Sequence, residues 1–204
     1  IPVYLSQKSP DYIINCAAYT QVDKAESESE IAEWINARAV EKISRICEEK
    51  GMILLQLSTD YVYHSDHQLV HFEKDPCWPK SVYAKTKFQA EEAIRKNLSK
   101  HIILRTSWVY SIYGHNFVKT MLRLGKEYEE LKIVNDQIGS PSLANDIAEA
   151  LFLIIRHIDR HEKFNDWGVY NFSNLGFISW AEFAEEIFKQ SNLKVKITSI
   201  PSSE

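Results

Sequence analysis

Glycine is scarce in this sequence, which has six glycines among 204 residues. A dinucleotide-binding fold has a glycine-rich turn after its first strand, because the backbone there must approach a pyrophosphate closely at a helix N-terminus. The two nearest glycines, Gly168 and Gly176, are eight positions apart, so neither G-x-G-x-x-G nor G-x-x-G-x-x-G occurs. The sequence as it stands therefore excludes a phosphate-binding turn of this kind.

Cysteine pairs, a strong net charge and long apolar runs are also absent. The three cysteines, Cys16, Cys47 and Cys77, form no C-x-x-C pair, and an odd number argues against a disulfide framework and favours a reducing cytoplasm. The net charge is -4, which is not the electrostatic footprint of a nucleic-acid-binding protein. No apolar run approaches the ~20 residues that span a membrane, so we expect no membrane segment.

Three short runs of residues are mainly apolar, without a polar residue at every second position, at 11–18, 52–57 and 101–105. Such runs are typical of strands that are buried on both faces of a parallel sheet. A further strand is expected at 168–172 and a last short one at 194–198. The first three runs alternate with helical patterns, which predicts βαβ units.

The first helical pattern has a start and a stop signal. Ser27 and Glu30 have capping-box spacing, and Gly51 stands where a helix C-terminus is expected. We expect Trp34 to be a core residue rather than a ligand. The apolar residues of this helix fall on one stripe: Ile31, Trp34, Ile35, Ile43, Ile46 and Cys47.

Further helices are predicted over roughly 82–97, 117–124 and 145–157, and from a capping pair at Ser179 and Glu182 through Phe188. The pattern is looser after Trp108. The predicted fold is α/β, a Rossmann-type doubly wound parallel sheet with a smaller, partly intertwined C-terminal region. We place the sheet portion at 1–109 and 143–173, and the second region at 110–142 and 174–204.

The stretch "STDYVYHSD" ends a buried strand in polar residues: Ser58, Thr59, Asp60 and Tyr61. Such groups are costly in a core unless they are hydrogen-bonded. Ligands of open parallel sheets bind outside the carboxyl ends of the strands. We therefore expect residues 17–20, 58–61 and 106–108 to line one crevice.

Tyr83 and Lys87 are four positions apart on a predicted helix and so lie on one face. A Lys ammonium near a Tyr hydroxyl favours the phenolate, so we expect it to lower the Tyr83 pKa from its usual value of ~10. That would make Tyr83 a usable acid or base near neutrality. The pair alone fits a solvated surface better than a site, but Ser58 and Thr59 on the preceding strand reverse that preference.

Several segments in series resemble the extended short-chain dehydrogenase/reductases, and the resemblance covers nearly the whole chain from about Pro10. They are "PDYIINCAAYTQVDKAESE", "STDYVY", "SVYAKTKFQAEEAI", "LRTSWVY", "NFVKTMLRL" and "NDQIGSPS". Within that family the similarity is greatest to enzymes that reduce the C4 keto group of dTDP-4-dehydro-L-rhamnose to dTDP-L-rhamnose. The resemblance thus implies an NADPH- or NADH-dependent oxidoreductase of deoxysugar and surface polysaccharide biosynthesis.

The resemblance also implies site roles. The family's catalytic triad falls on Thr59, Tyr83 and Lys87. Tyr83 gives a proton to the C4 oxygen of the sugar, Lys87 holds the nicotinamide ribose, and Thr59 orients the reacting groups. The implied cofactor-binding residues are Ala17, Ala18, Tyr19, Thr20, Tyr83 and Lys87. The implied residues for the sugar nucleotide are Thr59, Asp60, Trp108, Val22 and Tyr61. A homodimer is possible on the same ground.

The pair Asp60-Tyr61 bears on the reaction. Relatives that dehydrate hexoses have Asp-Glu there, because elimination of water needs an additional acid and base, and epimerases have small residues. Reduction fits better than either reaction. Two alternatives remain: another sugar-nucleotide reductase or epimerase, and a non-catalytic regulatory subunit similar to that of methionine adenosyltransferase.

Two further expectations concern absences. His64, His67, His71 and Cys77 are spaced as zinc ligands can be, but they lie in a polar loop without a second paired cluster, so we expect no metal site. The family's glycine-rich turn lies upstream of the segment that matches Pro10. We therefore expect this sequence to be part of a longer protein, without the first βαβ portion, and to bind NADPH poorly as it stands.

Overall fold

The computed structural model describes residues 10–63 and 70–203. The chain divides into two compact units. The first unit combines residues up to Thr106 with Ile155–Phe172, and the second combines Ser107–Ile154 with Ser173–Glu204. Within the described ranges, no helix has both the length and the apolar character that crossing a membrane requires.

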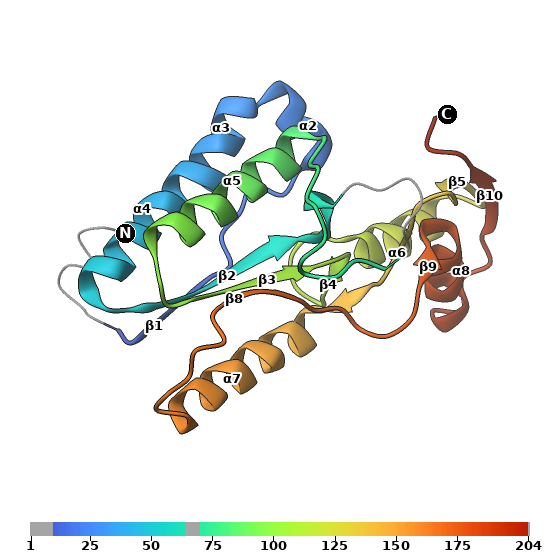
Figure 1. Ribbon diagram of the computed structural model, residues 1–204. Coiled ribbons are helices and arrows are strands. Elements are labelled where there is room, and N and C mark those ends of the chain that lie inside the picture. Colours follow the sequence, from blue (N-terminus) through green and yellow to red (C-terminus); the bar gives the residue numbers. More distant parts are fainter. Residues whose placement is uncertain (1–9, 64–69, 204) are drawn as a thin grey trace. The chain divides into compact units, whose positions relative to one another are not determined.

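The first unit contains a four-stranded sheet (Figure 1), and all of its strand pairs are parallel. Its order is β1-β2-β3-β8, which is also the order along the chain. The strands are β1 (Tyr12–Asn15), β2 (Ile53–Thr59), β3 (His101–Thr106) and β8 (Gly168–Asn171). The prediction of parallel strands in a Rossmann-like α/β fold is confirmed, and β2 and β3 are buried as predicted. The predicted burial of β1 is wrong, since only Asn15 of that strand is buried and Ile14 is exposed.

Helices cover both faces of this sheet. The segments α3 (Ser29–Glu33), α4 (Ala39–Lys50) and α5 (Val82–Asn97) lie on one face, and the end of α7 (Ala144–Arg160) lies on the other (Figure 1). Gly51 ends α4 in the left-handed conformation, with φ 69°, as its position in the sequence predicts.

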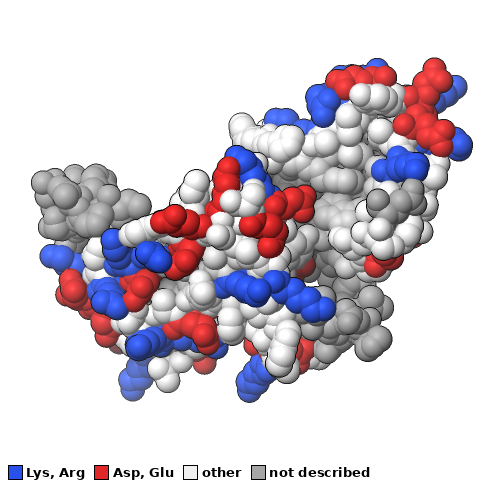
Figure 2. Space-filling model, turned by 90° about the horizontal axis from the view of Figure 1, so that it is seen from above, with Lys and Arg blue, Asp and Glu red and all other residues white. Residues whose placement is uncertain are grey.

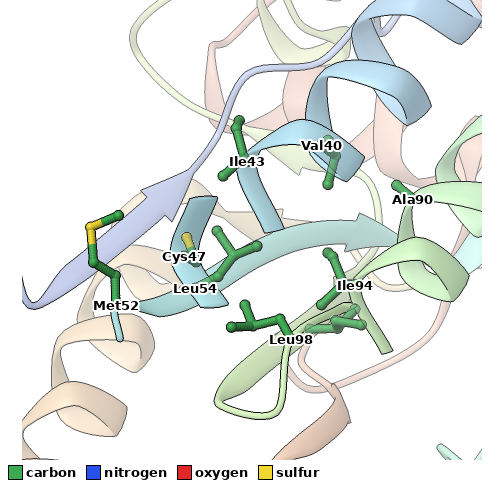
Figure 3. Close-up of a cluster of buried hydrophobic side chains, with 9 residues drawn as sticks. Val40, Ile43, Cys47, Met52, Leu54, Ala90, Ile94 and Leu98 are labelled. Atoms are coloured by element: carbon green, nitrogen blue, oxygen red, sulfur yellow. The ribbon is translucent and has the colours of Figure 1, made fainter. Parts of the chain in front are cut away.

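The core of the first unit lies between the sheet and the helices α4 and α5 (Figure 3). Side chains from α4, β2, α5 and β3 meet there with almost no exposure to solvent. The cluster consists of Val40, Ile43, Cys47, Met52, Leu54, Ala90, Ile94, Leu98 and Ile103. This packing holds α5 against β2, which matters for the site described below.

The predicted capping box at Ser27 and Glu30 is wrong. A first helix, α2 (Val22–Ser27), ends at Ser27, and the Ser27 hydroxyl donates back to the Lys24 carbonyl at 3.0 Å. The next helix, α3, starts after Glu28 without a side-chain cap. Glu28 instead accepts from Tyr19 Oη and forms an ion pair with Lys24.

The predicted core position of Trp34 is also wrong. Ile31, Trp34 and Ile35 are 49%, 45% and 39% exposed, whereas Ile43 and Cys47 of the same stripe are buried. A π-helical turn, η1 (Trp34–Arg38), precedes α4 and places small or polar residues inward, including Ala37 and Asn36. The small inward residues allow α5 to approach, and the bulky ones stay outside. Arg38 lies over the Trp34 ring, 4.6 Å from its centroid.

The second unit contains two whole helices, the first part of α7 and pairs of short strands. The whole helices are α6 (Phe117–Glu127) and α8 (Trp180–Gln190). The strand β5 (Glu130–Val134) pairs in parallel with β10 (Lys196–Ile200). Two smaller pairs join β4 (Val109–Tyr110) to β7 (Ser142–Leu143) and β6 (Ile138–Gly139) to β9 (Ile178–Ser179). The short strands β6 and β7 lie after Trp108, where the sequence pattern is looser.

The packing of α6 against α8 supplies the core of the second unit. Met121 and Ile133 meet Ala184 and Phe188 there. The capping box predicted at Ser179 is confirmed, since Ser179 Oγ accepts from the backbone N–H of Glu182 and the Glu182 carboxylate accepts from Ser179 N.

Basic and acidic side chains are interspersed over the face of the molecule seen in Figure 2.

Candidate active site

The polar end of β2 forms a tight turn rather than continuing into a core. The 3₁₀ turn η2 (Asp60–Val62) follows β2 directly. Thr59 caps it, because Thr59 Oγ1 accepts from Tyr61 N at 3.2 Å and donates to Asp60 Oδ1 at 3.2 Å. Thr59, the Asp60 carboxylate and the Tyr61 backbone N–H therefore satisfy one another locally, and the Ser58 hydroxyl donates to Glu91, which explains how a buried strand can end in these residues.

Tyr83 stands beside this turn. It lies in the first turn of α5, which Ser81 caps by accepting from Ala84 N at 3.1 Å. The Tyr83 ring meets the Tyr61 ring edge-on, with 6.1 Å between centroids. Burial raises the pKa of Tyr83 to about 12, and a hydrogen bond with the Thr59 side chain acts in the opposite direction. Thr59 and Tyr83 are thus neighbours, as the sequence predicted.

Lys87 lies one turn further along α5 and is 4% exposed. Its Nζ donates to the carbonyl of Leu57 at 2.7 Å. Burial lowers the pKa of Lys87 to about 8, and the charge of Glu91 opposes that shift. The expectation that Lys87 lowers the Tyr83 pKa is not met: desolvation dominates at Tyr83, and Lys87 is directed to the strand carbonyl instead.

Asp60 and Tyr61 are partly buried in the same turn. Desolvation raises the pKa of Asp60 to about 6, against the opposing effect of its hydrogen bonds with Thr59 and with backbone N–H groups. Burial and the neighbouring Asp60 raise the pKa of Tyr61 to about 12. A carboxyl group that titrates near neutrality and two protonated phenols therefore surround the Thr59 hydroxyl.

The segment after β1 leads to the neighbouring part of the same sheet edge. Asn36 pins Tyr19 in both directions, accepting from Tyr19 N at 2.8 Å and donating to Tyr19 O at 3.1 Å. Ala17 and Thr20 are exposed, and Ala18 and Val22 are partly buried. On the other side of β2, Thr106 of β3 is in register with Thr59. Its buried hydroxyl has no hydrogen-bond partner in the described part of the chain.

A buried polar network lies beneath these residues, and the sequence analysis did not find it. Arg105 of β3 forms a two-pronged ion pair with Glu91 of α5, at 3.0 Å and 2.5 Å. Ser58 Oγ donates to Glu91 Oε1 at 2.5 Å, and Arg105 Nη1 donates to Tyr63 Oη at 2.5 Å. The signal was present, since Glu91 continues the spacing of Tyr83 and Lys87 by one more turn.

Trp108 belongs to the second unit and is partly buried there. Its φ is 45°, in the left-handed region, and its ring stacks on Trp180 with 3.5 Å between centroids. A Cβ added at Gly139 would lie 2.4 Å from the Trp108 ring, so only glycine allows this approach. Phe117 extends the cluster on the far side of the contact, 4.5 Å from Trp180.

The loop histidines show no metal arrangement within the described residues. His64 and His67 lie outside the described residues. His71 stacks on Tyr63 with 4.5 Å between centroids, and Cys77 Sγ lies 3.9 Å from the Asp75 carbonyl. No group of three His, Cys, Asp or Glu side chains in the described part of the chain could hold a metal ion.

The sequence of the whole chain matches a known family. The family model described as the RmlD substrate binding domain matches residues 1–204. The chain belongs to the RmlD substrate binding domain family. A curated relative from Escherichia coli (strain K12), named dTDP-4-dehydrorhamnose reductase, is 42% identical over 182 residues, which are 89% of this chain and 60% of that protein.

Two further proteins are similar to this chain over most of its length. A relative from Bacillus subtilis (strain 168), named spore coat polysaccharide biosynthesis protein SpsK, is 39% identical over 96% of this chain and 66% of its own length. A crystal structure of dTDP-4-dehydrorhamnose reductase from Bacillus anthracis in complex with NADP superposes with a TM-score of 0.92 at 38% identity, over 98% of this chain and 69% of that chain. The chain thus spans about two thirds or less of the curated relatives' length.

Proposed function

We propose that the protein carrying this sequence reduces the C4 keto group of dTDP-4-dehydro-L-rhamnose to give dTDP-L-rhamnose, with NADPH as the reductant. The observation that carries the proposal is the meeting of Thr59, Tyr83 and Lys87 at the carboxyl end of β2. The names of the RmlD relatives support the substrate. In this proposal residues 1–109 and 143–173 form the cofactor-binding portion, which also contributes contacts to the sugar nucleotide, and residues 110–142 and 174–204 form the substrate-binding region.

Tyr83 is the proton donor in this reaction. A phenol with a pKa of about 12 keeps its proton at neutral pH, as a donor must. The sugar oxygen becomes an alkoxide as C4 accepts hydride, and an alkoxide is a stronger base than a phenolate, so transfer from Tyr83 remains favourable. Thr59 orients the same oxygen by hydrogen bonding. Bound NADPH supplies the hydride.

The residues present suit the nicotinamide ribose. An ammonium has three donors, and Lys87 uses one of them on Leu57 O within the described structure, which leaves donors for ribose hydroxyls. Ala17 and Thr20 are exposed, so the segment after β1 is accessible to the same ribose in this proposal. The remaining cofactor residues in this proposal are Ala18 and Tyr19.

Asp60, Tyr61, Val22 and Trp108 are the proposed contacts of the sugar nucleotide. Asp60-Tyr61 supports reduction over dehydration, because a phenol with a raised pKa is a poor substitute for the carboxylate base that dehydration needs. Three free thiols fit a cytoplasmic location. We also propose a homodimer, which the resemblance to the extended short-chain dehydrogenase/reductases implies.

The test is to incubate the full protein with NADPH and dTDP-4-dehydro-L-rhamnose, follow NADPH oxidation by absorbance and identify the sugar product by NMR. We expect one NADPH oxidised per dTDP-L-rhamnose formed. UDP-glucose serves as the control substrate, for which we expect no epimerised product. NADPH that stays reduced while a large catalytic partner co-purifies would instead favour a regulatory subunit.

A further inference from the structure

Helix α5 and strand β2 are joined at three successive points. Tyr83, Lys87 and Glu91 are each one turn apart and therefore share one face of α5. Their partners are three consecutive residues of β2: Thr59 for Tyr83, Leu57 for Lys87 and Ser58 for Glu91. The position of α5 along β2 thus depends on all three contacts together, and the Glu91 contact is the one furthest from the reacting groups.

Glu91 is held more firmly than the other two residues. It is 0% exposed, and the guanidinium of Arg105, itself 3% exposed, meets both of its carboxylate oxygens. The fork geometry of Arg fixes the plane of the carboxylate as well as its position. Arg105 is fixed in turn by Tyr63, whose ring lies 4.7 Å from it and whose hydroxyl donates to Asn171.

Stability alone does not account for this ion pair. The desolvation of two buried charges offsets much of their attraction, and apolar replacements of such pairs are often neutral or stabilising. The ionisable groups that act on Lys87 are Glu91 from its own helix and the Cys16 thiol just after β1, and burial raises the Cys16 pKa, so the thiol keeps its proton at neutral pH. Arg105 from β3 faces Glu91 on the other side. The pair therefore places a fixed negative charge one turn from Lys87.

We propose that Glu91 is a positioning residue: held by Arg105 and Ser58, it fixes where Tyr83 and Lys87 stand against the end of β2. This inference rests on the proposed function, because it assigns Glu91 a part in the same site. Glu91 itself contacts neither the proposed substrate nor the cofactor.

The decisive variant is Glu91→Gln, which keeps the size of the side chain and an acceptor for Ser58 but removes the charge. Since the Glu91 charge opposes the lowering of the Lys87 pKa, its loss should move the titration of Lys87 downward from about 8. The Lys87 pKa can be read from the pH dependence of the ¹⁵N NMR signal of its side chain. We expect that pKa to fall by about one unit. The alkaline limb of kcat should move in the same direction, and kcat should fall about 10-fold or more.

The matched control is Glu92→Gln, the next residue of the same helix. The Glu92 side chain is 63% exposed and lies 3.9 Å from Arg95. This variant should leave kcat, its pH profile and the Lys87 titration as in the parent protein. A Glu91→Gln protein that unfolds at lower temperature while the Lys87 titration and the pH profile stay in place would overturn the proposal, since the role of Glu91 would then be structural.

Ser58→Ala keeps the proposal testable if Glu91→Gln does not fold. It removes one hydrogen bond to Glu91 and no charge, so kcat should fall several-fold with KM and the Lys87 titration unchanged. An unchanged kcat in Ser58→Ala would contradict the positioning role. Failure of the proposed function would look different: the parent protein would oxidise no NADPH, while the NMR titration would still report on Glu91 and Lys87.

Discussion

The two units of the molecule hold their candidate site residues by different physical means. In the first unit, hydrogen bonds and buried charges fix Tyr83 and Lys87 against the end of β2. In the second, Trp108 is fixed by ring stacking on Trp180 and by the absence of a side chain at Gly139. One arrangement depends on the direction of individual bonds, and the other on shape and volume.

This difference suits the two tasks that we propose. Proton transfer needs a hydroxyl placed to within a fraction of an ångström, and directional bonds supply that placement. Recognition of a sugar nucleotide needs a broad contact surface, which stacked aromatic rings provide. Substitutions that remove a single polar atom should therefore act mainly through the first unit, and substitutions that change volume mainly through the second.

The largest effect is expected for Tyr83→Phe. The change removes one hydroxyl and retains the ring that meets Tyr61. Loss of the proton donor should lower kcat by about 10²–10⁴-fold, with sugar-nucleotide affinity nearly unchanged by calorimetry. Tyr128→Phe is the matched control on an exposed tyrosine of the second unit. Full turnover in the Tyr83 variant would remove Tyr83 from the reaction.

Asp60→Asn should stabilise the protein at neutral pH. The folded-state pKa of about 6 lies above the ordinary Asp value of 3.8, so the folded state binds more protons between these values. Stability contributed by this group is therefore lost as pH rises from about 4 to about 6, and the full cost applies above pH 6. We expect Asp60→Asn to raise the free energy of unfolding by about 1–2 kcal/mol at pH 7 and to have little effect near pH 4.

Urea unfolding at the two pH values measures this effect. Asp23→Asn, on an exposed carboxylate of α2, is the control and should change stability by less than about 0.5 kcal/mol. The same gain at both pH values would show that desolvation of the Asp60 carboxylate is not its source. If Asp60→Asn gained stability but lost turnover, the result would indicate that the Asp60 charge is retained for function.

Apolar patterns in the sequence were sufficient to predict the fold of the first unit. The runs at 52–57 and 101–105 are buried strands because each is apolar on both faces, and Gly51 ends its helix because it can adopt positive φ. The helix around Trp34 was predicted less well. A strict helical repeat places Ile31 and Trp34 on the core stripe, but the π turn shifts which residues face inward, and local propensity does not report such a turn.

The candidate site was predictable only in part. Tyr83 and Thr59 could be paired because Thr59 ends a predicted strand and Tyr83 lies at the start of the predicted helix that follows it. The direction of the Lys87 side chain could not be predicted, because its partner is the backbone carbonyl of Leu57. Every residue has such a carbonyl, so the sequence does not mark this one. The partner of Glu91 was hidden for another reason: Arg105 is fourteen positions away and comes into reach only when β3 lies beside β2.

Gly139→Ala tests whether shape governs the second unit. The added methyl would lie 2.4 Å from the Trp108 ring, so the ring must move away from its place on Trp180. We expect this variant to weaken sugar-nucleotide binding about 10-fold, as Trp108→Ala should, with cofactor affinity unchanged by calorimetry. Leu175→Ala, on an exposed side chain of the same unit, is the control. Equal losses of both affinities in Trp108→Ala would make Trp108 a core residue.

The smallest effects are expected from removing one helix cap in each unit, and they should differ between the two units. Ser81 caps α5 by accepting from Ala84 N, and Ser179 caps α8 by accepting from Glu182 N. Each Ser→Ala change should lower the free energy of unfolding by about 1 kcal/mol, measured in urea. Only Ser81→Ala should also lower kcat, by a few-fold, because the first turn of α5 carries Tyr83. Thr at either position should restore most of the lost stability, since it retains the capping hydroxyl. If Ser179→Ala lowered kcat as much as Ser81→Ala, the placement of Tyr83 would not depend on the local order of α5, and general loosening of the fold would explain both results.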